Sequence, residues 1–293
     1  MDTFDNSKFL NLNKIIKYPP NNSSKGFESY FYEKYMENNI ETGLKYLPIQ
    51  WTNYYAENNY GEDLKEIKDY LEQNLEKNNK YFTITQLAGG PLISLKDTVV
   101  FSMGGMFRTP LNPNLSYIYL PLIYKDMKKT FKKNKKYLGS YQGRLTHPIR
   151  KTLERKLKRK DGFFINNLNT MSSDFEKNNI DDFETLISDS YFSICPRGFG
   201  PTSFRLYESI GLGSVPVYVS DTFVLPFSEI IDWSKLAVII KPNEINKIPK
   251  IINEILNSNK YVEMLEYGSY CFENYFNYSY LDQYIRKVLK NFK

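Results

Sequence analysis

The clearest chemical pattern in this sequence is a strand, a loop and a helix that follow one another between Ser193 and Ser209. The predicted strand ends at Cys195, the loop carries two glycines and two prolines, and the predicted helix begins at Thr202 or Ser203. Ligands of parallel α/β sheets bind at the carboxyl ends of the strands. The N-terminus of the following helix offers free backbone N–H groups and a partial positive charge, which suit a phosphate group.

Charged and hydroxyl side chains are concentrated at this turn. Arg197 lies in the loop, Arg205 in the first turn of the helix, and Glu208 three residues further along, on the same helix face. A diphosphate needs several hydrogen-bond donors, and Thr202 and Ser203 add two hydroxyl groups to those of the arginines. A ribose needs a carboxylate that accepts hydrogen bonds from its two hydroxyl groups. In the alternative interpretation, Ser203 only caps the helix, and Arg205 and Glu208 form a surface ion pair that stabilises little. The residue types alone leave both interpretations open.

The elements that position this segment are predicted from local patterns. Short runs rich in β-branched and aromatic residues predict strands at Tyr81–Gln86, Thr98–Met103, Ser116–Ile123, Tyr137–Tyr141, Tyr191–Cys195, Val215–Val219 and Leu236–Ile240. Apolar residues at helical spacing and helix-boundary residues predict helices at Glu62–Lys77, His147–Lys160, Phe183–Asp189, Ser203–Leu212, Asn243–Leu256 and Tyr280–Lys293. Because the two kinds of element alternate, we expect parallel sheets in two α/β domains, residues 1–130 and 131–278, followed by a helix at residues 279–293.

The composition excludes several classes of protein. With 293 residues, 41% of them hydrophobic and 45 of them Tyr or Phe, the chain is globular and not disordered. Cys195 and Cys271 are far apart and form no disulfide framework, which favours a reducing compartment. The single histidine, His147, excludes a His-rich metal site; we interpret it as a polar residue at a helix start, with a role beside Arg150 at a phosphate as the alternative.

The termini and the hydropathy predict a soluble cytoplasmic protein with no membrane contact. Residues Met1–Asp5 begin a polar segment without the apolar core of a signal peptide. No run of about 18 apolar residues occurs anywhere in the sequence, so no transmembrane helix is expected.

Positive charge is concentrated in one segment. The net charge is +6, but residues 125–160 carry +13, so the remainder carries −7. Such a segment is typical of a nucleic-acid-binding protein, although Lys125–Lys136 also resembles a solvated linker. Six of the eight arginines lie between residues 144 and 205, and arginine binds phosphate in a fixed, bidentate geometry.

The segments Cys195–Ser209, Gly213–Asp221 (GSVPVYVSD) and Leu225–Glu229 (LPFSE), with Trp233, resemble the exostosin family of glycosyltransferases. The likeness spans residues 137–245 when Gly143-Arg144 and His147–Arg150 are included. The first 130 residues are similar only in short stretches, and there to short soluble members from viruses and microbes.

The resemblance implies a glycosyltransferase-B architecture, with two Rossmann-like domains facing a cleft and the last helix crossing back to the first domain. It implies inverting transfer, without a metal or other cofactor, from a UDP-sugar to a glycan or glycoprotein acceptor. Xylose is one candidate sugar, and a capsid glycan of a large DNA virus one candidate acceptor. The donor-binding residues that it implies are Arg144, Arg150, Arg197, Thr202, Ser203, Arg205, Glu208 and Asp221.

The catalytic base and the acceptor site are expected in the first domain. An inverting displacement needs a carboxylate near the acceptor hydroxyl. Glu57 is the first candidate and Asp63 the second. Trp51, Tyr54 and Tyr55 are candidates for stacking on acceptor sugars, with packing in the core as the alternative.

Two rival functions stay open at this point. The chain could bind nucleic acid through the basic 125–160 segment, or it could be an inactive member of the family that serves as a partner subunit. The motifs favour the enzyme, and we expect no nucleic-acid partner.

Overall fold

The computed structural model describes residues 9–10, 26–58, 61–76, 78–91, 93, 95, 97–105, 116–168 and 180–292, without the side chains of residues 180–182. Residues Met1–Asp5, Lys77 and Lys293 of the predictions above lie outside these ranges. The chain divides into two compact units, which are described separately below. Unit 1 comprises Met1–Asp126 and Asn277–Lys293, and unit 2 comprises Met127–Phe276. The corresponding boundaries expected from the sequence lie at residues 130 and 278.

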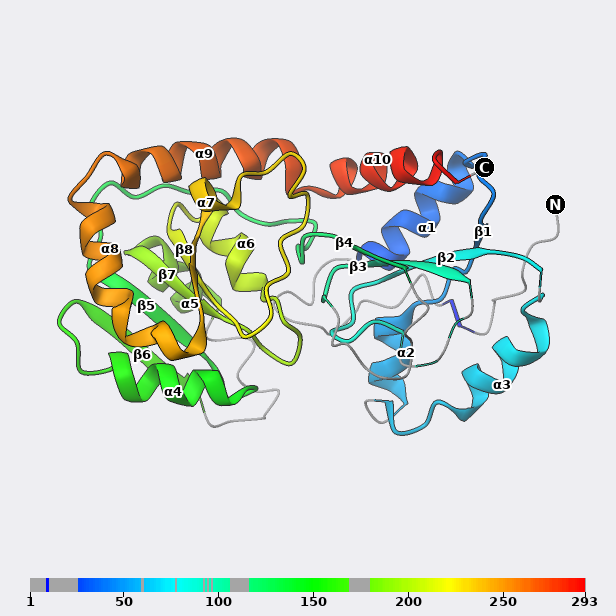
Figure 1. Cartoon of the computed structure of the whole chain (residues 1–293), viewed down its shortest axis with the longest axis horizontal. Coiled ribbons are helices and arrows are strands. Elements are labelled where there is room, and N and C mark those ends of the chain that lie inside the picture. The colour runs from blue at the N-terminus through cyan, green and yellow to red at the C-terminus, as the bar shows by residue number, and fades with distance from the viewer. Residues whose placement is uncertain are drawn as a thin grey trace. The chain divides into compact units, whose positions relative to one another are not determined.

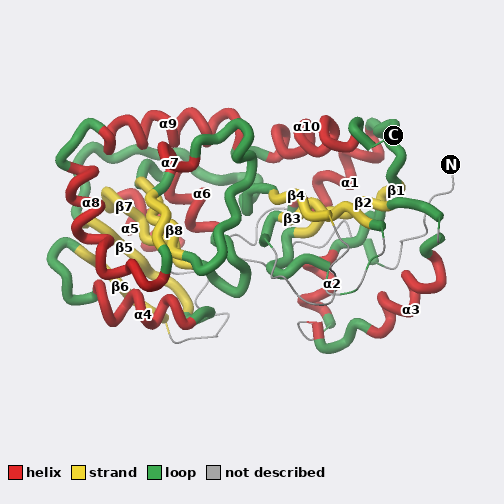
Figure 2. Tube along the Cα trace, in the orientation of Figure 1, coloured by secondary structure: helices red, strands yellow, loops and turns green. Residues whose placement is uncertain are grey.

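Unit 2 is built on a parallel sheet of five strands (Figures 1 and 2). The strands are β5 (Tyr137–Arg144), β6 (Phe163–Leu168), β7 (Ser190–Pro196), β8 (Val215–Val219) and β9 (Val238–Ile240). Their spatial order is β6-β5-β7-β8-β9, and every neighbouring pair is parallel. This is the doubly wound order in which the chain first moves to one edge of the sheet and then returns to extend the other.

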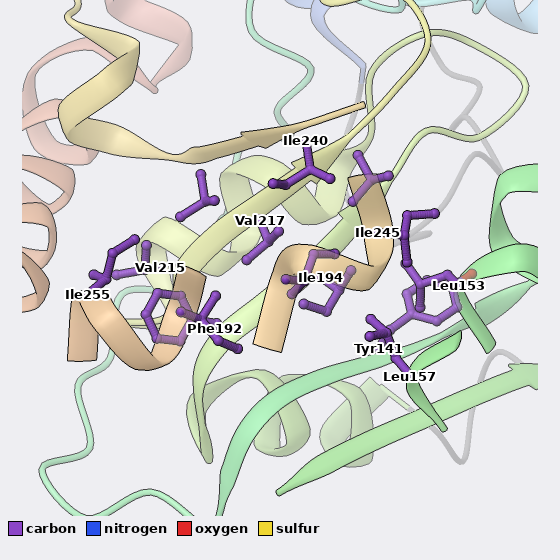
Figure 3. Close-up of a cluster of buried hydrophobic side chains, with 14 of the residues drawn as sticks. Tyr141, Leu153, Leu157, Phe192, Ile194, Val215, Val217, Ile240, Ile245 and Ile255 are labelled. Atoms are coloured by element: carbon purple, nitrogen blue, oxygen red, sulfur yellow. The ribbon is translucent and has the colours of Figure 1, made fainter. Parts of the chain in front are cut away.

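Helices cover both faces of this sheet. They are α4 (Pro148–Leu157), α5 (Ile180–Ser188), α6 (Phe204–Gly211), α7 (Trp233–Leu236), the 3₁₀ helix η3 (Pro242–Lys247), α8 (Ile248–Leu256) and α9 (Lys260–Tyr275). The apolar sides of α4, η3 and α8 pack on alternate residues of the strands, such as Phe192 and Ile194 of β7 (Figure 3). Cys195 points to the opposite face, where its Sγ lies 3.5 Å from the Ser209 Oγ of α6.

Unit 1 contains a second, smaller parallel sheet. Its strands are β1 (Lys45–Tyr46), β2 (Tyr81–Thr85), β3 (Thr98–Ser102) and β4 (Ser116–Tyr119), in the order β1-β2-β3-β4. All residues of β2 and β3 are buried, as expected for parallel strands covered on both faces. The helices of this unit are α1 (Phe27–Glu37), α2 (Trp51–Glu57), α3 (Lys65–Asn74) and α10 (Tyr278–Leu289).

The last helix, α10, packs within unit 1 against α1. The ring of Phe27 lies 4.9 Å from that of Tyr278, edge to face. The guanidinium of Arg286 donates to the carbonyl oxygens of Lys34 and Asn38, at 2.9 and 2.6 Å. These contacts hold the C-terminal end of α1 and the start of the following segment on the C-terminal helix.

The expected fold class, α/β with two parallel sheets, is confirmed. Several boundaries differ from the expected ones; the strand expected at Leu236–Ile240, for example, begins at Val238, because residues 233–236 form α7. The strand expected at Ser116–Ile123 ends at Tyr119, because Pro121 has no N–H group to donate to a sheet. The helix expected from Asn243 begins as the tighter η3 and becomes α-helical at Ile248.

Candidate active site

The candidate site lies where the winding of the unit 2 sheet reverses. Strand β5 is followed by α4 and the outer strand β6, whereas β7 is followed by α6 and by strands on the other side. The loops after β5 and β7 therefore leave the sheet in opposite directions, and ligands of open α/β sheets bind in the resulting crevice. Strands β5 and β7 pair only as far as Ser140 and Ser193, while β5 continues to pair with β6 up to Arg144. The two central strands thus separate before they end.

The start of α6 carries polar groups without partners among the described residues. Ser203 precedes the helix in an extended conformation, and its hydroxyl makes no capping hydrogen bond. The first backbone N–H groups of a helix have no partner within the helix. Thr202 is 4% exposed, and its Oγ1 has no hydrogen-bond partner among the described residues. Backbone and hydroxyl donors therefore converge on the same point.

Arg205 in the first turn of α6 is buried, with only 6% of its surface exposed. Its Nη2 donates to the carbonyl oxygen of Gln142 at the end of β5. Its guanidinium lies over the rings of Phe183 and Tyr141, 4.4 and 5.1 Å from their centroids. Its Nη1 has no hydrogen-bond partner among the residues that the structure describes. Burial lowers the pKa of Arg205, but a guanidinium keeps its charge in proteins, so an anion is the partner that this geometry can accept.

Glu208 lies one turn further along α6 and is 4% exposed. Burial raises its pKa to about 7, against the opposing effect of the Arg205 charge. Although both side chains are described, no ion pair within 4 Å joins them. The alternative interpretation, a surface ion pair, is therefore wrong, because both groups are buried. A buried carboxylate in this position can accept hydrogen bonds from the hydroxyl groups of a ligand.

Arg197, in the loop after β7, is 3% exposed and is held by its own loop. Its Nη1 forms an ion pair with Asp221, which follows β8, and its Nη2 donates to the Phe199 carbonyl oxygen at 3.2 Å. Partial burial raises the pKa of Asp221, but the hydrogen bond and charge of Arg197 outweigh it and leave the pKa below its usual value. Arg197 and Asp221 thus fix the loop conformation.

The remaining two arginines differ from each other. The guanidinium of Arg150, on α4, donates to backbone carbonyl groups of both loops: to Arg144 O at 2.7 Å, Arg197 O at 3.0 Å and Pro196 O at 3.3 Å. Arg144, the last residue of β5, is half-buried, and its side chain makes no hydrogen bond or ion pair with the described part of the chain. Arg144 and Arg205 therefore keep donors for a ligand, and Arg150 uses all three guanidinium nitrogens within the protein.

His147 is the N-cap of α4, the structural role favoured by the sequence. Its Nδ1 accepts from the Ile149 N–H at 3.3 Å. Burial and the charge of Arg197 lower the pKa of His147, so the imidazole is neutral near pH 7 and can act as this acceptor. Cys195 is fully buried, and burial raises the pKa of its thiol to about 11, so it is unreactive near neutral pH.

The residues expected to bind an acceptor lie together in unit 1. Trp51, Tyr54 and Tyr55 of α2 line a narrow pocket, which Leu64, Leu87 and Ile93 complete and which has room for about one water molecule. Trp51 and Tyr54 also belong to the core of this unit, and the indole N–H of Trp51 donates to Thr83 Oγ1 at 2.8 Å. Of the three aromatic residues, Tyr55 alone is partly exposed. These aromatic side chains therefore pack in the core and line a pocket at once.

The two candidate bases are both exposed. Glu57 is the last residue of α2, and Asp63 precedes α3. The sequence analysis missed a third carboxylate of unit 1, Glu28 in the first turn of α1, which is 2% exposed and has a pKa raised to about 7 by burial. It accepts hydrogen bonds from Thr52 and Gln86. Nothing in the local sequence marks Glu28 as buried, because a glutamate in a first helical turn is ordinarily exposed.

Among the described residues, no group of three or more His, Cys, Asp or Glu side chains is arranged to hold a metal ion. No helix in the same ranges is long and apolar enough to cross a membrane.

A family model described as "Exostosin GT47 domain" matches residues 99–255, more than half of the chain. The "Exostosin-1 homolog" of Caenorhabditis elegans is 38% identical over 71 residues, which are 24% of this chain and 19% of that protein. The "Probable glucuronosyltransferase GUT1" of Oryza sativa subsp. japonica is 30% identical over 95 residues, 32% of this chain and 22% of that protein. The chain thus aligns with about a fifth of the length of these relatives.

Solved structures show only a distant likeness. The crystal structure of the pneumococcal O-GlcNAc transferase GtfA in complex with UDP and GlcNAc has a TM-score of 0.46 and 9% identity, covering 92% of this chain and 60% of that one. The crystal structure of TarM has a TM-score of 0.43 and 12% identity, covering 74% and 51%.

Proposed function

This chain belongs to the exostosin GT47 family, and we propose that it transfers a sugar from a UDP-sugar to a hydroxyl group of a glycan acceptor. The observation that carries the proposal is the pair of buried ionisable groups on α6. The Arg205 Nη1 has no hydrogen-bond partner among the described residues, and Glu208, only 4% exposed, forms no ion pair with it. A nucleoside diphosphate supplies the missing partner of each: phosphate oxygens for the arginine and ribose hydroxyl groups for the carboxylate.

We assign the diphosphate to the N-terminus of α6. Thr202, Ser203 and the first backbone N–H groups of the helix donate to it, together with Arg205 and Arg144. When the bond between the sugar and UDP breaks, its electron pair goes to the β-phosphate oxygen. Fixed positive groups aimed at that oxygen stabilise the charge as it develops. In this assignment the arginines and the helix dipole take the part that a metal ion plays in other enzymes.

The transfer that we propose is inverting. The acceptor hydroxyl oxygen attacks the anomeric carbon on the face opposite to UDP, while a carboxylate takes its proton. Glu57 is our first choice for this base and Asp63 the second, because both are exposed and therefore accessible to an acceptor. Glu28 is not proposed as the base, since its carboxylate is buried and engaged with Thr52 and Gln86. The ring of Tyr55, which is partly exposed, is our candidate for stacking on the acceptor sugar.

The finer identity of the substrates rests on the family alone. Xylose is one candidate for the transferred sugar, and the relatives named as probable glucuronosyltransferases make glucuronic acid another. A viral capsid glycan is a candidate acceptor for a short soluble member of the family.

The rival function, nucleic-acid binding through residues 125–160, is disfavoured by ion pairs within unit 2. Lys128 pairs with Glu184 at 2.6 Å, Lys132 with Asp189 at 2.6 Å, and Lys129 with Glu273. These acidic partners reduce the positive field that a nucleic-acid backbone would meet. Three of the lysines are thus paired with acidic side chains of the surface on which they lie.

A screen of UDP-sugars tests the proposal. The purified chain is incubated with each UDP-sugar, and thermal stabilisation and release of UDP are measured. One sugar nucleotide is expected to stabilise the protein and to be hydrolysed slowly, and Arg205→Leu is expected to lose both effects. Salt-sensitive RNA binding without UDP binding would instead favour the nucleic-acid alternative. UDP binding with no turnover of any sugar nucleotide, with or without glycan acceptors, would favour an inactive partner subunit.

The base is tested separately. Glu57→Gln is expected to leave UDP affinity intact and to stop transfer to the acceptor, with Asp63→Asn as the matched comparison. Unchanged transfer by Glu57→Gln would reject the first assignment, and loss of transfer by Asp63→Asn alone would establish the second.

A further inference from the structure

The two central strands of unit 2 separate before they end, and Arg150 lies across the gap. Pairing between β5 and β7 stops at Ser140 and Ser193. Each strand then continues for several residues, to Arg144 and Pro196, without a hydrogen bond to the other. Carbonyl groups beyond the last ladder bond need another partner, since a buried carbonyl without one is unfavourable.

Arg150 donates to such carbonyl groups on both sides, and the carbonyl of Arg144 also accepts from the Thr146 N–H at 2.9 Å. Its Nη1 donates to the carbonyl of Arg144 on the β5 side, and its Nε and Nη2 donate to the carbonyls of Arg197 and Pro196 on the β7 side. One planar guanidinium therefore joins the ends of two strands that no longer pair. Its position is fixed in turn by the first turn of α4 and by the Tyr141 ring, whose centroid lies 5.8 Å from the guanidinium carbon.

The same contacts make Arg150 a poor phosphate ligand. Arginine binds a phosphate bidentately through two adjacent N–H groups, of which the Nε and Nη2 edge is one such pair. In Arg150 this edge is occupied by two consecutive carbonyl groups, those of Pro196 and Arg197. The backbone of Gly198 also lies close to this edge, since a Cβ at position 198 would be only 3.2 Å from the Arg150 Nη2.

We propose that Arg150 is a positioning residue, which sets the separation of the loops after β5 and β7 instead of contacting the diphosphate. This inference rests on the function proposed above. The loops carry Arg144 on one side and the approach to Thr202 and Ser203 on the other. Without the bridge, the donors for the nucleotide would lose their fixed spacing, although none of them would be removed.

Affinities for uridine, UMP and UDP distinguish the two roles in the full chain. A phosphate ligand matters more as phosphates are added, whereas a positioning residue affects all three ligands. Arg150→Gln and Arg150→Lys are expected to weaken uridine and UDP binding by the same factor, on the order of tenfold. The lysine variant is included because it keeps the charge but cannot reproduce the planar spacing of the three guanidinium nitrogens. Arg205→Leu, at the residue assigned to the diphosphate, is the control and is expected to weaken UDP binding far more than uridine binding.

Two outcomes would overturn the inference. One is a selective loss of UDP affinity in Arg150→Gln with uridine affinity unchanged. The other is wild-type behaviour of Arg150→Lys, which would show that charge alone suffices.

Hydrogen exchange provides a readout that needs no ligand. Arg150→Lys is expected to speed amide exchange in both loops, residues 144–146 and 197–199, whereas Arg205→Leu leaves the second loop protected. Unchanged protection in Arg150→Lys would reject the positioning role even if the chain binds no nucleotide. If the wild-type chain binds no uridine or UDP but the expected exchange is observed, the proposed function is wrong and the positioning role of Arg150 is still supported.

Discussion

The carboxyl ends of the two parallel sheets both gather buried charged side chains, yet their partners differ. In unit 1, Glu28 accepts hydrogen bonds from Thr52 N, Thr52 Oγ1 and Gln86 N, at 3.2, 2.8 and 2.8 Å. In unit 2, Glu208 is equally buried, but the nearby Arg205 forms no ion pair with it and has an Nη1 without a hydrogen-bond partner among the described residues. Burial raises the pKa of both carboxylates to about 7.

This difference distinguishes buried charged groups that stabilise the fold from buried charged groups that are available to a ligand. A buried polar group that is fully hydrogen-bonded contributes to a unique structure. A buried polar group without a partner costs free energy, which a protein tolerates where function requires it. Within unit 2 the same contrast separates Arg150, which uses all its guanidinium nitrogens within the protein, from Arg144 and Arg205, which keep donors.

The largest expected effect is on stability, from replacing each buried carboxylate by leucine. Glu28→Leu leaves three buried donors without an acceptor and is expected to lower the free energy of unfolding by about 3 kcal/mol. Glu208→Leu leaves no such donors, but it removes a negative charge that interacts with the buried Arg205, so a smaller loss is expected. Urea unfolding of both variants measures the difference. Equal losses would mean that the two carboxylates play the same structural role.

The next effect concerns the ligand that Glu208 is proposed to bind. A carboxylate that accepts from the ribose hydroxyl groups should favour UDP over 2′-deoxy-UDP by about tenfold, since hydrogen bonds to charged groups contribute ~1.5–3 kcal/mol. Glu208→Gln should reduce this preference while binding 2′-deoxy-UDP nearly as well as the wild type does. Calorimetric titration of the two proteins with the two nucleotides gives the interaction energy between Glu208 and the 2′-hydroxyl group directly. A wild type that binds both nucleotides equally would remove the ribose from the assignment.

The two units also differ in how much of them the sequence predicted. In unit 2 the turn at Cys195–Ser209 was placed correctly, because glycine, proline and a helix start are local signals. The roles of Arg150 and Arg205 could not be told apart in the same way. Both are arginines near a strand end, and only the fold brings the carbonyls of Arg144 and Pro196 to one of them.

In unit 1 the prediction failed where the pattern is weak. Helix α1 was not anticipated in a segment of weak overall periodicity, although Phe27, Phe31 and Tyr35 follow one another at helical spacing. These aromatic residues pack on strands far along the chain, as Phe31 does on Phe82. Strand β6 of unit 2 was missed for a similar reason, since Phe163–Leu168 ends in two asparagines and a leucine and does not alternate. Burial of Glu28 depends on Gln86, 58 residues away, which no local pattern can show.

A smaller effect is the pH dependence of the two carboxylates. In the folded protein the pKa of each carboxylate is about 7, whereas in the unfolded chain it is about 4.5. The resulting contribution to the free energy of unfolding is complete below pH 4.5 and is lost as the pH rises through about 7. Both groups should therefore lower stability between pH 5 and 7. Only Glu208 should also affect binding, because its ionised form accepts from the ribose.

Uridine is the probe for this effect, since it carries no phosphate that titrates. Its affinity is expected to rise by less than about tenfold between pH 6 and 8, following a single ionisation with a pKa of about 7. The rise should vanish in Glu208→Gln and persist in Glu28→Gln. If Glu28→Gln abolishes the pH dependence instead, the titrating group belongs to unit 1 and the contrast between the units is wrong.

The smallest effect tests how tightly the unit 2 loops are held. A Cβ at position 198 would lie 3.2 Å from the Arg150 Nη2 and 3.5 Å from the Thr146 Oγ1. The first distance requires a shift of a few tenths of an ångström by a guanidinium that three carbonyl groups hold in place. Gly198→Ala is therefore expected to cost about 1 kcal/mol in uridine binding, as overpacking does elsewhere. In the double variant with Arg150→Gln the additional loss of uridine affinity should largely disappear, because the guanidinium that the new Cβ would contact is then absent. If the two losses of affinity add fully instead, the loops do not depend on the contacts of Arg150.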